Sequence, residues 1–272
     1  MVRYIAGIVG LGFVAALLFS LFGSVSGLIN DPQPESAAAM LYKHPKELAL
    51  DSDGFMGKIN VRQAQRGFQV YKEVCANCHS LSLVAFRDLK KIGYTDAEVK
   101  KIAADWGTKQ SVQDPKTGDR TERANVPADH FPKVYYPGTG VPPDLSLITK
   151  ARHEGPAYIY SLLTGYAEQT PELIAKHPDA KTPDGSYYNP YFPNLNIAMP
   201  PPLAQDGQVT YADGTPSTVA QNAKDVAEFL VWTAEPELND RHSLGLAVLG
   251  FLFVATILAY GAYQSIWRNV KH

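Results

Sequence analysis

The two cysteines of this 272-residue chain, Cys75 and Cys78, stand two residues apart, and His79 follows at once. A thioredoxin-like site needs a βαβ context that the flanking residues do not provide, and a zinc site needs two more ligands at metal spacing, whereas the seven histidines are scattered. Cys-x-x-Cys-His is also the signature of covalent haem attachment. There two thiols bind the two vinyl groups of one porphyrin, and the adjacent histidine reaches the iron. The sequence therefore predicts a domain folded around one covalently bound haem c, with no cysteine left for a disulfide.

Haem attachment of this type requires export, so the N-terminal end should carry a membrane or targeting signal. Arg3 precedes an apolar run from about Tyr4 to Phe22, and small residues follow at Ser24 and Ser26. The run is short for a comfortable membrane span, which favours a signal peptide that is removed after Ser26 over a retained anchor. Residues 1–26 are thus expected to be a signal peptide or an N-terminal membrane segment.

The C-terminal end predicts a transmembrane anchor. No charged residue occurs over the 24 positions from Leu244 to Trp267, and about 20 apolar residues cross the hydrocarbon core of a bilayer. Arg268 and Lys271 follow, and positive charge favours the cytoplasmic side. The pattern predicts a periplasmic haem domain over residues 27–240, an anchor over 241–267 and a short cytoplasmic tail over 268–272. The net charge of −2 gives no sign of a nucleic-acid partner, and membrane lipid is the expected surroundings of the anchor.

The second axial ligand of the iron is expected to be Met199. Of the four methionines, Met1, Met40 and Met56 precede the haem motif, and in c-type folds the distal ligand comes from downstream. Several prolines flank Met199, and they stiffen the loop that would present its flexible thioether. A His/Met pair raises the reduction potential and closes the iron to outside ligands. His153 is the next candidate.

Two amphipathic helices are predicted to frame the haem. Residues 60–74 follow helical spacing after Asn60, a suitable N-cap, and residues 222–236 present a second apolar face that ends at Pro236. Gly67 would let the two helices approach closely. Between them, Asp144 is expected to begin a helix, and residues 157–163 read as a buried one. Arg152 is a candidate partner for a haem propionate. The fold class expected is mainly α, a c-type cytochrome domain with long loops anchored by one C-terminal transmembrane helix.

Four blocks in the same order resemble the cytochrome c1 family, the haem subunits of ubiquinol–cytochrome c reductase (the cytochrome bc1 complex). They are RGFQVYKEVCANCHSL, PPDLSLITKARHEGPAYIYSLLTGY, NPYFPNLNIAMPPPL and DGTPSTVAQNAKDVAEFLVWTAEPE. The resemblance implies thioether bonds at Cys75 and Cys78 and axial ligation by His79 and Met199. It also implies that Arg152 faces a propionate, and that the haem pocket is lined by Tyr158, Leu162, Leu163, Phe192, Pro142 and Pro143.

The resemblance further implies a place in the respiratory chain. The partners would be the cytochrome b subunit, a Rieske iron–sulfur protein as electron donor and a soluble or membrane-tethered c-type cytochrome as acceptor. The chain would be a subunit of an oxidoreductase in the bacterial cytoplasmic membrane, with quinol oxidation itself on another subunit. The competing interpretations are the c-type subunit of a terminal oxidase and a haem-based gas sensor. The C-terminal anchor and the PPDLS and NPYFP blocks favour cytochrome c1 over the first, and the absence of a signalling domain disfavours the second.

The sequence departs from the family pattern in two places. The run before PPDLS is shorter than usual, which puts one haem-edge contact in doubt, and Asn194-Leu195-Asn196 stand where small residues are common. The charged stretch from Asp96 to Asp129 interleaves acidic and basic residues, so it reads as a solvated loop rather than as a charge patch that steers a redox partner.

Overall fold

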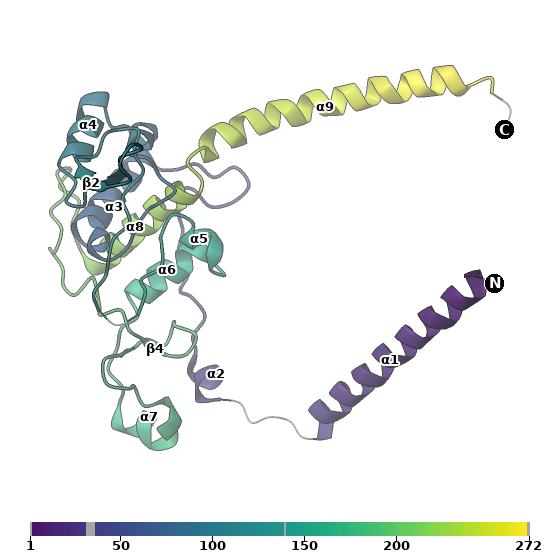
Figure 1. Cartoon of the computed structure of the whole chain (residues 1–272), viewed down its shortest axis with the longest axis horizontal. Coiled ribbons are helices and arrows are strands. Elements are labelled where there is room, and N and C mark those ends of the chain that lie inside the picture. The colour runs from purple at the N-terminus through teal and green to yellow at the C-terminus, as the bar shows by residue number, and fades with distance from the viewer. Residues whose placement is uncertain (1, 31–35, 139, 271–272) are drawn as a thin grey trace. The chain divides into compact units, whose positions relative to one another are not determined.

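The computed structural model describes residues 2–30, 36–138 and 140–270, which form two compact units, Met1–Leu41 and Tyr42–His272 (Figure 1). The first unit holds α1 (Val2–Asn30) and α2 (Ala37–Leu41). Every side chain of α1 lies on the surface of the unit apart from a half-buried one at Ser26, and Arg3 is its one charged residue. The helix is long and apolar enough to cross a membrane.

The second unit is mainly helical, as predicted. Two helices dominate it, α3 (Val61–Glu73) and α8 (Val219–Ala234), followed by the long α9 (Leu238–Trp267). Its shorter helices are η1 (Cys75–Asn77), η2 (Phe86–Ile92), α4 (Asp96–Ala104), α5 (Ile148–Ala151), α6 (Gly155–Leu163), α7 (Pro171–Lys176) and η3 (Pro178–Ala180). Two antiparallel pairs supply the strands, β1 (Gln110–Gln113) with β2 (Arg120–Arg123) and β3 (Tyr187–Tyr188) with β4 (Asn196–Ile197).

The predicted crossing of two helices is confirmed between α3 and α8. Asn60 caps α3, because its side chain accepts a hydrogen bond from the backbone N–H of Gln63. At the crossing, a Cβ placed on Gly67 would lie 2.0 Å from the carbonyl oxygen of Asp225, so only glycine fits there. Phe68 meets Phe229 beside this point, with ring centroids 5.6 Å apart. The crossing is therefore the centre of the core.

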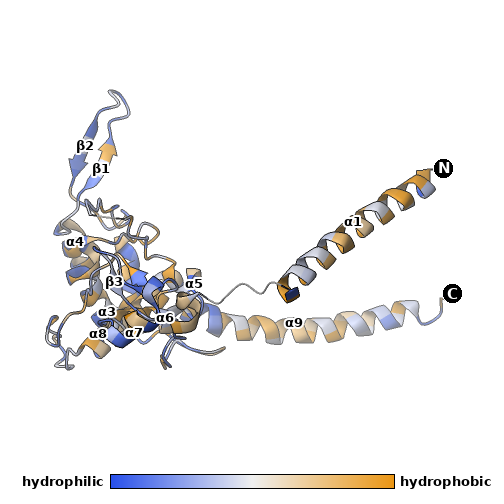
Figure 2. Ribbon diagram, turned by 90° about the horizontal axis from the view of Figure 1, so that it is seen from below, coloured by the Kyte–Doolittle hydropathy of each residue, from blue (hydrophilic) through white to orange (hydrophobic). Residues whose placement is uncertain are grey.

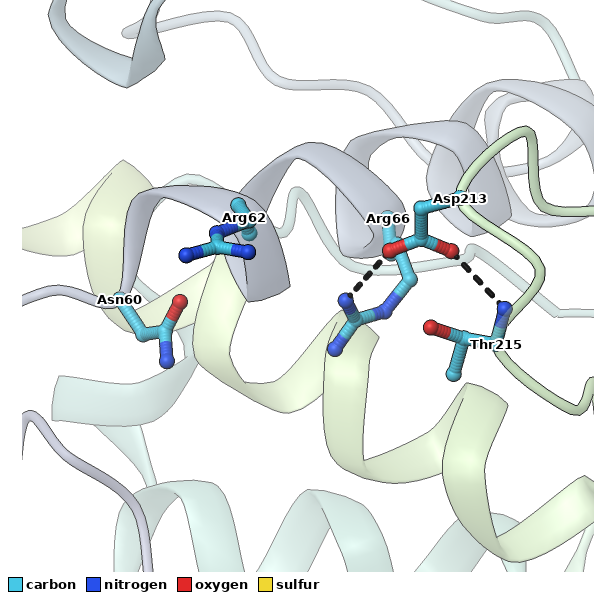
Figure 3. Close-up of a pocket in the computed structure, with 5 residues that line it drawn as sticks. All are labelled: Asn60, Arg62, Arg66, Asp213 and Thr215. Carbon is cyan, nitrogen blue, oxygen red and sulfur yellow. Dashed lines mark hydrogen bonds and ion pairs between the residues drawn. The ribbon is translucent and has the colours of Figure 1, made fainter.

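A buried ion pair locks the same two helices. The carboxylate of Asp225 is fully buried on α8, and the guanidinium of Arg66 binds it through two hydrogen bonds of 2.8 and 3.1 Å. Gln221 donates a third hydrogen bond to Asp225, and the exposed Asp213 binds the outer edge of the guanidinium at 2.9 Å. Figure 3 shows the hollow beside this network, which is polar and has its acidic groups already paired. Two bonds from one rigid group fix the rotation of α3 against α8.

Ion pairs also fix the junction between α8 and α9. Glu235 binds Lys150 at 2.6 Å and Arg241 at 3.0 Å, while Glu237 binds Lys91. These contacts tie the first turn of α9 to α5 and η2. Beyond His242, α9 carries no charged side chain as far as Trp267, and apolar residues dominate it in Figure 2. This helix meets the requirements of length and composition for a membrane span.

Two local predictions need correction. Asp144 does not begin a helix: α5 starts at Ile148, because the Asp144 carboxylate binds backbone N–H groups of Ser82 and Ser146 instead of capping a turn. The charged stretch from Asp96 to Asp129 is not only loop. It contains α4, which Thr95 and Glu98 cap reciprocally, and the exposed β1–β2 hairpin that stands clear of the helices in Figure 2.

Candidate haem site

The Cys-x-x-Cys-His motif forms a tight turn at the end of α3. After Glu73 the chain enters η1, where the backbone N–H groups of Cys78 and His79 both donate to the carbonyl oxygen of Cys75, at 3.1 and 2.9 Å. Both cysteines are free thiols and half-buried. Burial, and then the neighbouring Cys78, raise the pKa of the Cys75 thiol to about 12, so it is a neutral thiol at physiological pH. Two unpaired thiols on one turn suit thioether formation rather than a structural disulfide.

The ring of His79 is oriented by a backbone carbonyl far along the chain. Its Nδ1 lies 2.8 Å from the carbonyl oxygen of Pro143. A carbonyl can only accept, so Nδ1 carries the proton and the lone pair of Nε2 is left for a metal ion. Burial lowers the pKa of His79 despite this hydrogen bond, which favours the neutral ring that binds metals. The buried Tyr71 donates to the His79 carbonyl at 2.9 Å and fixes the backbone.

The PPDLS block lies against the segment that follows the haem motif. The N–H of Leu145 donates to the Ser80 carbonyl at 2.9 Å, that of Ser82 to the Asp144 carboxylate at 2.8 Å, and that of Leu83 to the Ser146 hydroxyl at 3.1 Å. Partial burial acts to raise the pKa of Asp144, but the hydrogen bonds that Ser146 and Ser82 donate to its carboxylate outweigh burial and hold the pKa below its ordinary value. These three hydrogen bonds place the backbone carbonyl of Pro143 beside the His79 ring. The sequence did not indicate this contact.

Met199 lies at the edge of the same hydrophobic core as Cys75. Its side chain is half-buried, and its carbonyl accepts a 3.0 Å hydrogen bond from the Tyr166 hydroxyl. Upstream, the fully buried Asn189 pairs through its backbone with Leu195 and donates its side-chain amide to the Leu162 carbonyl at 2.8 Å. Hydrogen bonds, as well as prolines, therefore hold the loop that presents Met199. Its role as iron ligand stays a prediction.

The residues before Met199 adopt an unusual backbone. Leu195 has φ of 64°, in the left-handed region, which costs a residue with a side chain about 1 to 2 kcal/mol. The Leu195 side chain is 1% exposed, and the free energy gained by burying a leucine is about as large as this backbone cost and offsets it. The position where the family pattern allows a small residue is thus filled here by a buried apolar one.

The structure gathers most of the predicted pocket residues. Tyr158 and Leu162 are buried on α6, and Leu163 and Phe192 pack against the same core cluster as Cys75 and Met199. Pro142 is half-buried and Pro143 is joined to His79 as described. Arg152 is exposed after α5 and interacts with the Tyr158 hydroxyl, whose pKa is raised by burial and lowered in part by this contact. That these residues line a haem remains a prediction.

Lys46 is a contributor that sequence reasoning missed. Its ammonium lies 5.9 and 5.2 Å from the ring centroids of Tyr160 and Tyr191, and it donates to the carbonyl and hydroxyl of Thr164. Burial lowers the pKa of this lysine, as does the neighbouring Lys43. The side chain thus joins the end of α6 to the loop before Met199. A single lysine in an irregular segment gives no pattern from which this contact could be predicted.

The donor set fits a covalently bound haem better than a protein-bound metal ion. Within residues 2–30, 36–138 and 140–270, no group of three or more His, Cys, Asp or Glu side chains could hold a metal ion. The site offers instead two free thiols, one histidine with Nε2 free and one thioether, and Cys75 and Met199 pack against the same core of aromatic and aliphatic side chains. A porphyrin can supply the four equatorial nitrogens that such a set lacks.

The crossed helices, with a Cys-x-x-Cys-His turn at the end of the first, give this unit the architecture of a c-type cytochrome domain. The comparison with known sequences agrees, because residues 50–270 match the Cytochrome C1 family. The chain belongs to the cytochrome c1 family.

Three relatives show how far the similarity extends. Cytochrome c1 of Rhodospirillum rubrum is 43% identical over 236 residues, which cover 80% of this chain and 86% of that protein. Cytochrome b/c1 of Bradyrhizobium diazoefficiens is 45% identical over 239 residues, which cover 79% of this chain. This chain spans only about a third of that protein, because the matched residues make up 34% of it. The mitochondrial cytochrome b-c1 complex catalytic subunit of Candida albicans is 38% identical over 281 residues, covering 99% and 91% of the two chains.

Proposed function

We propose that this chain is the haem-carrying electron-transfer subunit of a ubiquinol–cytochrome c reductase complex. The observation that carries the proposal is the turn from Cys75 to His79, in which the Pro143 carbonyl orients the histidine ring through Nδ1 and leaves Nε2 for the iron. Burial favours the neutral form of this ring. Membership of the cytochrome c1 family supports the assignment to this complex. Cys75 and Cys78 would form the thioether bonds to one haem c, and His79 and Met199 would bind its iron.

When bound, the haem supplies a one-electron Fe(III)/Fe(II) couple. The chain's own residues set the conditions for it. The Pro143 carbonyl makes the His79 ring more basic and prevents its rotation. Tyr71 and Tyr166 hold the backbones of the two axial residues, so little reorganisation accompanies a change of charge. Tyr158, Leu162, Leu163 and Phe192 would exclude water, and the Arg152 guanidinium would balance a propionate.

The proposed partners follow from this assignment. The chain would accept one electron at a time from a Rieske iron–sulfur protein and pass it to a soluble or membrane-tethered c-type cytochrome, while the cytochrome b subunit oxidises quinol. α9 would anchor the chain beside cytochrome b, with the haem domain in the periplasm and residues 268–272 in the cytoplasm. Removal of residues 1–26 as a signal peptide belongs to the same proposal. The apolar composition of α1 and α9 supports membrane attachment.

The proposal is tested on the native complex, extracted in mild detergent through a tag on this chain. A quinol is added, and reduced-minus-oxidised spectra are recorded with and without an inhibitor of quinol oxidation. We expect b-type haem to co-purify and the c-type haem to be reduced only without inhibitor. If the c-type haem is isolated alone, or together with an oxygen-consuming partner, the chain is a different electron carrier.

A further inference from the structure

The loop from Asp51 to Ile59, here named the Phe55 loop, is a rigid structure. The N–H of Lys58 donates to the Asp51 carbonyl at 2.8 Å, and the N–H of Gly57 donates to that of Gly54 at 3.2 Å. A Cβ on Gly57 would lie 2.2 Å from the Ser52 carbonyl oxygen, so the turn requires glycine. Ser52 donates to the buried Glu228 at 2.6 Å, which joins the base of the loop to α8. The loop therefore presents its tip in a fixed position.

That tip carries two large apolar side chains on the surface. Phe55 is 76% exposed and Met56 is 47% exposed, and the neighbouring Lys58 is exposed as well. Exposure of a phenylalanine and a methionine to water does not stabilise a rigid loop, because burial of each side chain would contribute about 1.5 to 3 kcal/mol of stability. An apolar tip with a lysine beside it suits a surface that is apolar inside and charged outside.

The Phe55 loop is attached to the first turns of α9, where Figure 1 shows it as the slate-blue loop beside that helix. The His242 Nδ1 donates to the Gly57 carbonyl at 2.8 Å, and the His242 ring stacks on Phe55 with centroids 6.5 Å apart. The Asn239 side chain accepts from the N–H of Ile59 at 2.8 Å. The depth of the loop relative to a membrane is thus fixed by α9.

The length of the apolar run places this attachment in the headgroup layer. A run of 24 residues is about 36 Å long at about 1.5 Å per residue, compared with a hydrocarbon core of about 30 Å. If the excess is shared between the two ends, the hydrocarbon boundary lies near Leu246 and His242 lies about 6 Å outside it. The headgroup layer is about 5 to 7 Å thick on each side, so His242 and the Phe55 ring stacked on it fall within that layer.

We propose that the Phe55 loop is a second membrane contact of this chain, which inserts Phe55 and Met56 into the lipid interface beside α9 and places Lys58 among the headgroups. The proposal rests on the membrane anchoring by α9 in the proposed function, but not on electron transfer. Its function would be to fix the tilt of the haem domain over the membrane, because a single helix can tilt in the bilayer and would carry the attached domain with it.

The test uses spin labels on the full chain in vesicles of phosphatidylcholine and phosphatidylglycerol. Labels are placed by Phe55→Cys and Met56→Cys, with Thr117→Cys in the turn of the exposed β1–β2 hairpin as the aqueous control and Ile257→Cys in α9 as the membrane control. The ratio of collisions with oxygen to collisions with a water-soluble nickel chelate reports depth. The chain without an added cysteine gives the background, which also shows whether Cys75 and Cys78 are blocked by haem.

We expect the ratio at Phe55 and Met56 to be severalfold higher than at Thr117 and lower than at Ile257. Equal ratios at Phe55, Met56 and Thr117, with Ile257 in the membrane, would overturn the proposal and leave the anchor intact. An aqueous ratio at Ile257 would overturn both the insertion of the Phe55 loop and the anchoring of the chain by α9. If both reagents are excluded from Phe55 in the native complex, the loop contacts a protein partner and the lipid assignment is wrong. Labelling of the background chain would instead contradict haem attachment, so the two failures are distinguishable.

Discussion

Replacement of Gly67 by alanine tests the helix crossing on which the haem domain is built. The added Cβ would lie 2.0 Å from the Asp225 carbonyl oxygen and 2.6 Å from the Phe229 Cβ. Ordinary contact needs about 3.5 Å, so α3 and α8 would have to separate by about 1.5 Å. Overpacking costs about 1 to 3 kcal/mol, and the upper end applies because a backbone carbonyl cannot rotate away. The higher helix propensity of alanine offsets about 1 kcal/mol of this cost. We expect a net loss of about 2 kcal/mol or more.

The assay is urea unfolding of the full chain in mild detergent, followed by the fluorescence of the core tryptophans Trp106 and Trp232. Gly107→Ala is the matched control, because nothing lies within 4 Å of a Cβ at that position. We expect the control to stay within about 0.5 kcal/mol of the parent chain. If the unfolding midpoint of Gly67→Ala equals that of Gly107→Ala, α3 and α8 do not cross in close contact at this glycine.

Three further predictions concern the ion pair of Arg66 with Asp225, the buried carboxylate of Glu228 and the thioether of Met199. Arg66→Met leaves the buried Asp225 without its cation and should lower the unfolding free energy by about 3 kcal/mol, whereas Asp213→Asn at the exposed edge should leave the urea midpoint nearly unchanged in the same assay. Burial raises the pKa of Glu228 above its ordinary 4.5, so the folded state holds the proton more tightly and the stability of the parent chain should fall as the pH rises above that value. Glu228→Gln should lack this decline, which urea midpoints at several pH values will show. Met199→Leu should lower the reduction potential in a redox titration and let carbon monoxide bind the iron.

Each of these predictions has a contradicting result. Equal losses for Arg66→Met and Asp213→Asn would mean that the pair with Asp225 does not lock the helices. Parallel pH profiles for Glu228→Gln and the parent chain would mean that the carboxyl is not perturbed. Met56→Leu is the control for Met199→Leu. Equal reduction potentials and equal carbon monoxide reactivity in the two variants would exclude Met199 as the proposed iron ligand.

The helical frame could be predicted because its signals are local. The apolar spacing of residues 60–74 and 222–236, the cap at Asn60 and the glycine at position 67 each depend on neighbours within a few residues, and the structure confirms them. The run from Leu244 to Trp267 reads as one helix for the same reason. The haem motif fixes three of the candidate site residues by spacing alone.

The rest of the site depends on backbone groups that leave no pattern in the sequence. The His79 ring binds the carbonyl of Pro143, 64 residues away, and any residue type supplies a carbonyl. Asp144 after two prolines is typical of a helix start, but its carboxylate finds donors in the distant Ser82 and the nearby Ser146. Asn194 and Asn196 tolerate a left-handed backbone better than leucine does, yet Leu195 adopts it, in a turn where its backbone bonds to Asn189 and Phe192. Contacts with distant residues decided the cases of His79 and Asp144, and the hydrogen bonds of its own turn accompany the backbone of Leu195.

We propose that the turn from Cys75 to His79 holds one covalently bound haem, and mass spectrometry of the native chain shows whether it does. The chain is extracted with acidic acetone to remove loosely bound haem, alkylated and cut after Lys72 and Arg87. We expect the peptide of residues 73–87 to carry the mass of one haem and no alkylated thiol. A peptide without haem, alkylated at both Cys75 and Cys78, would contradict it.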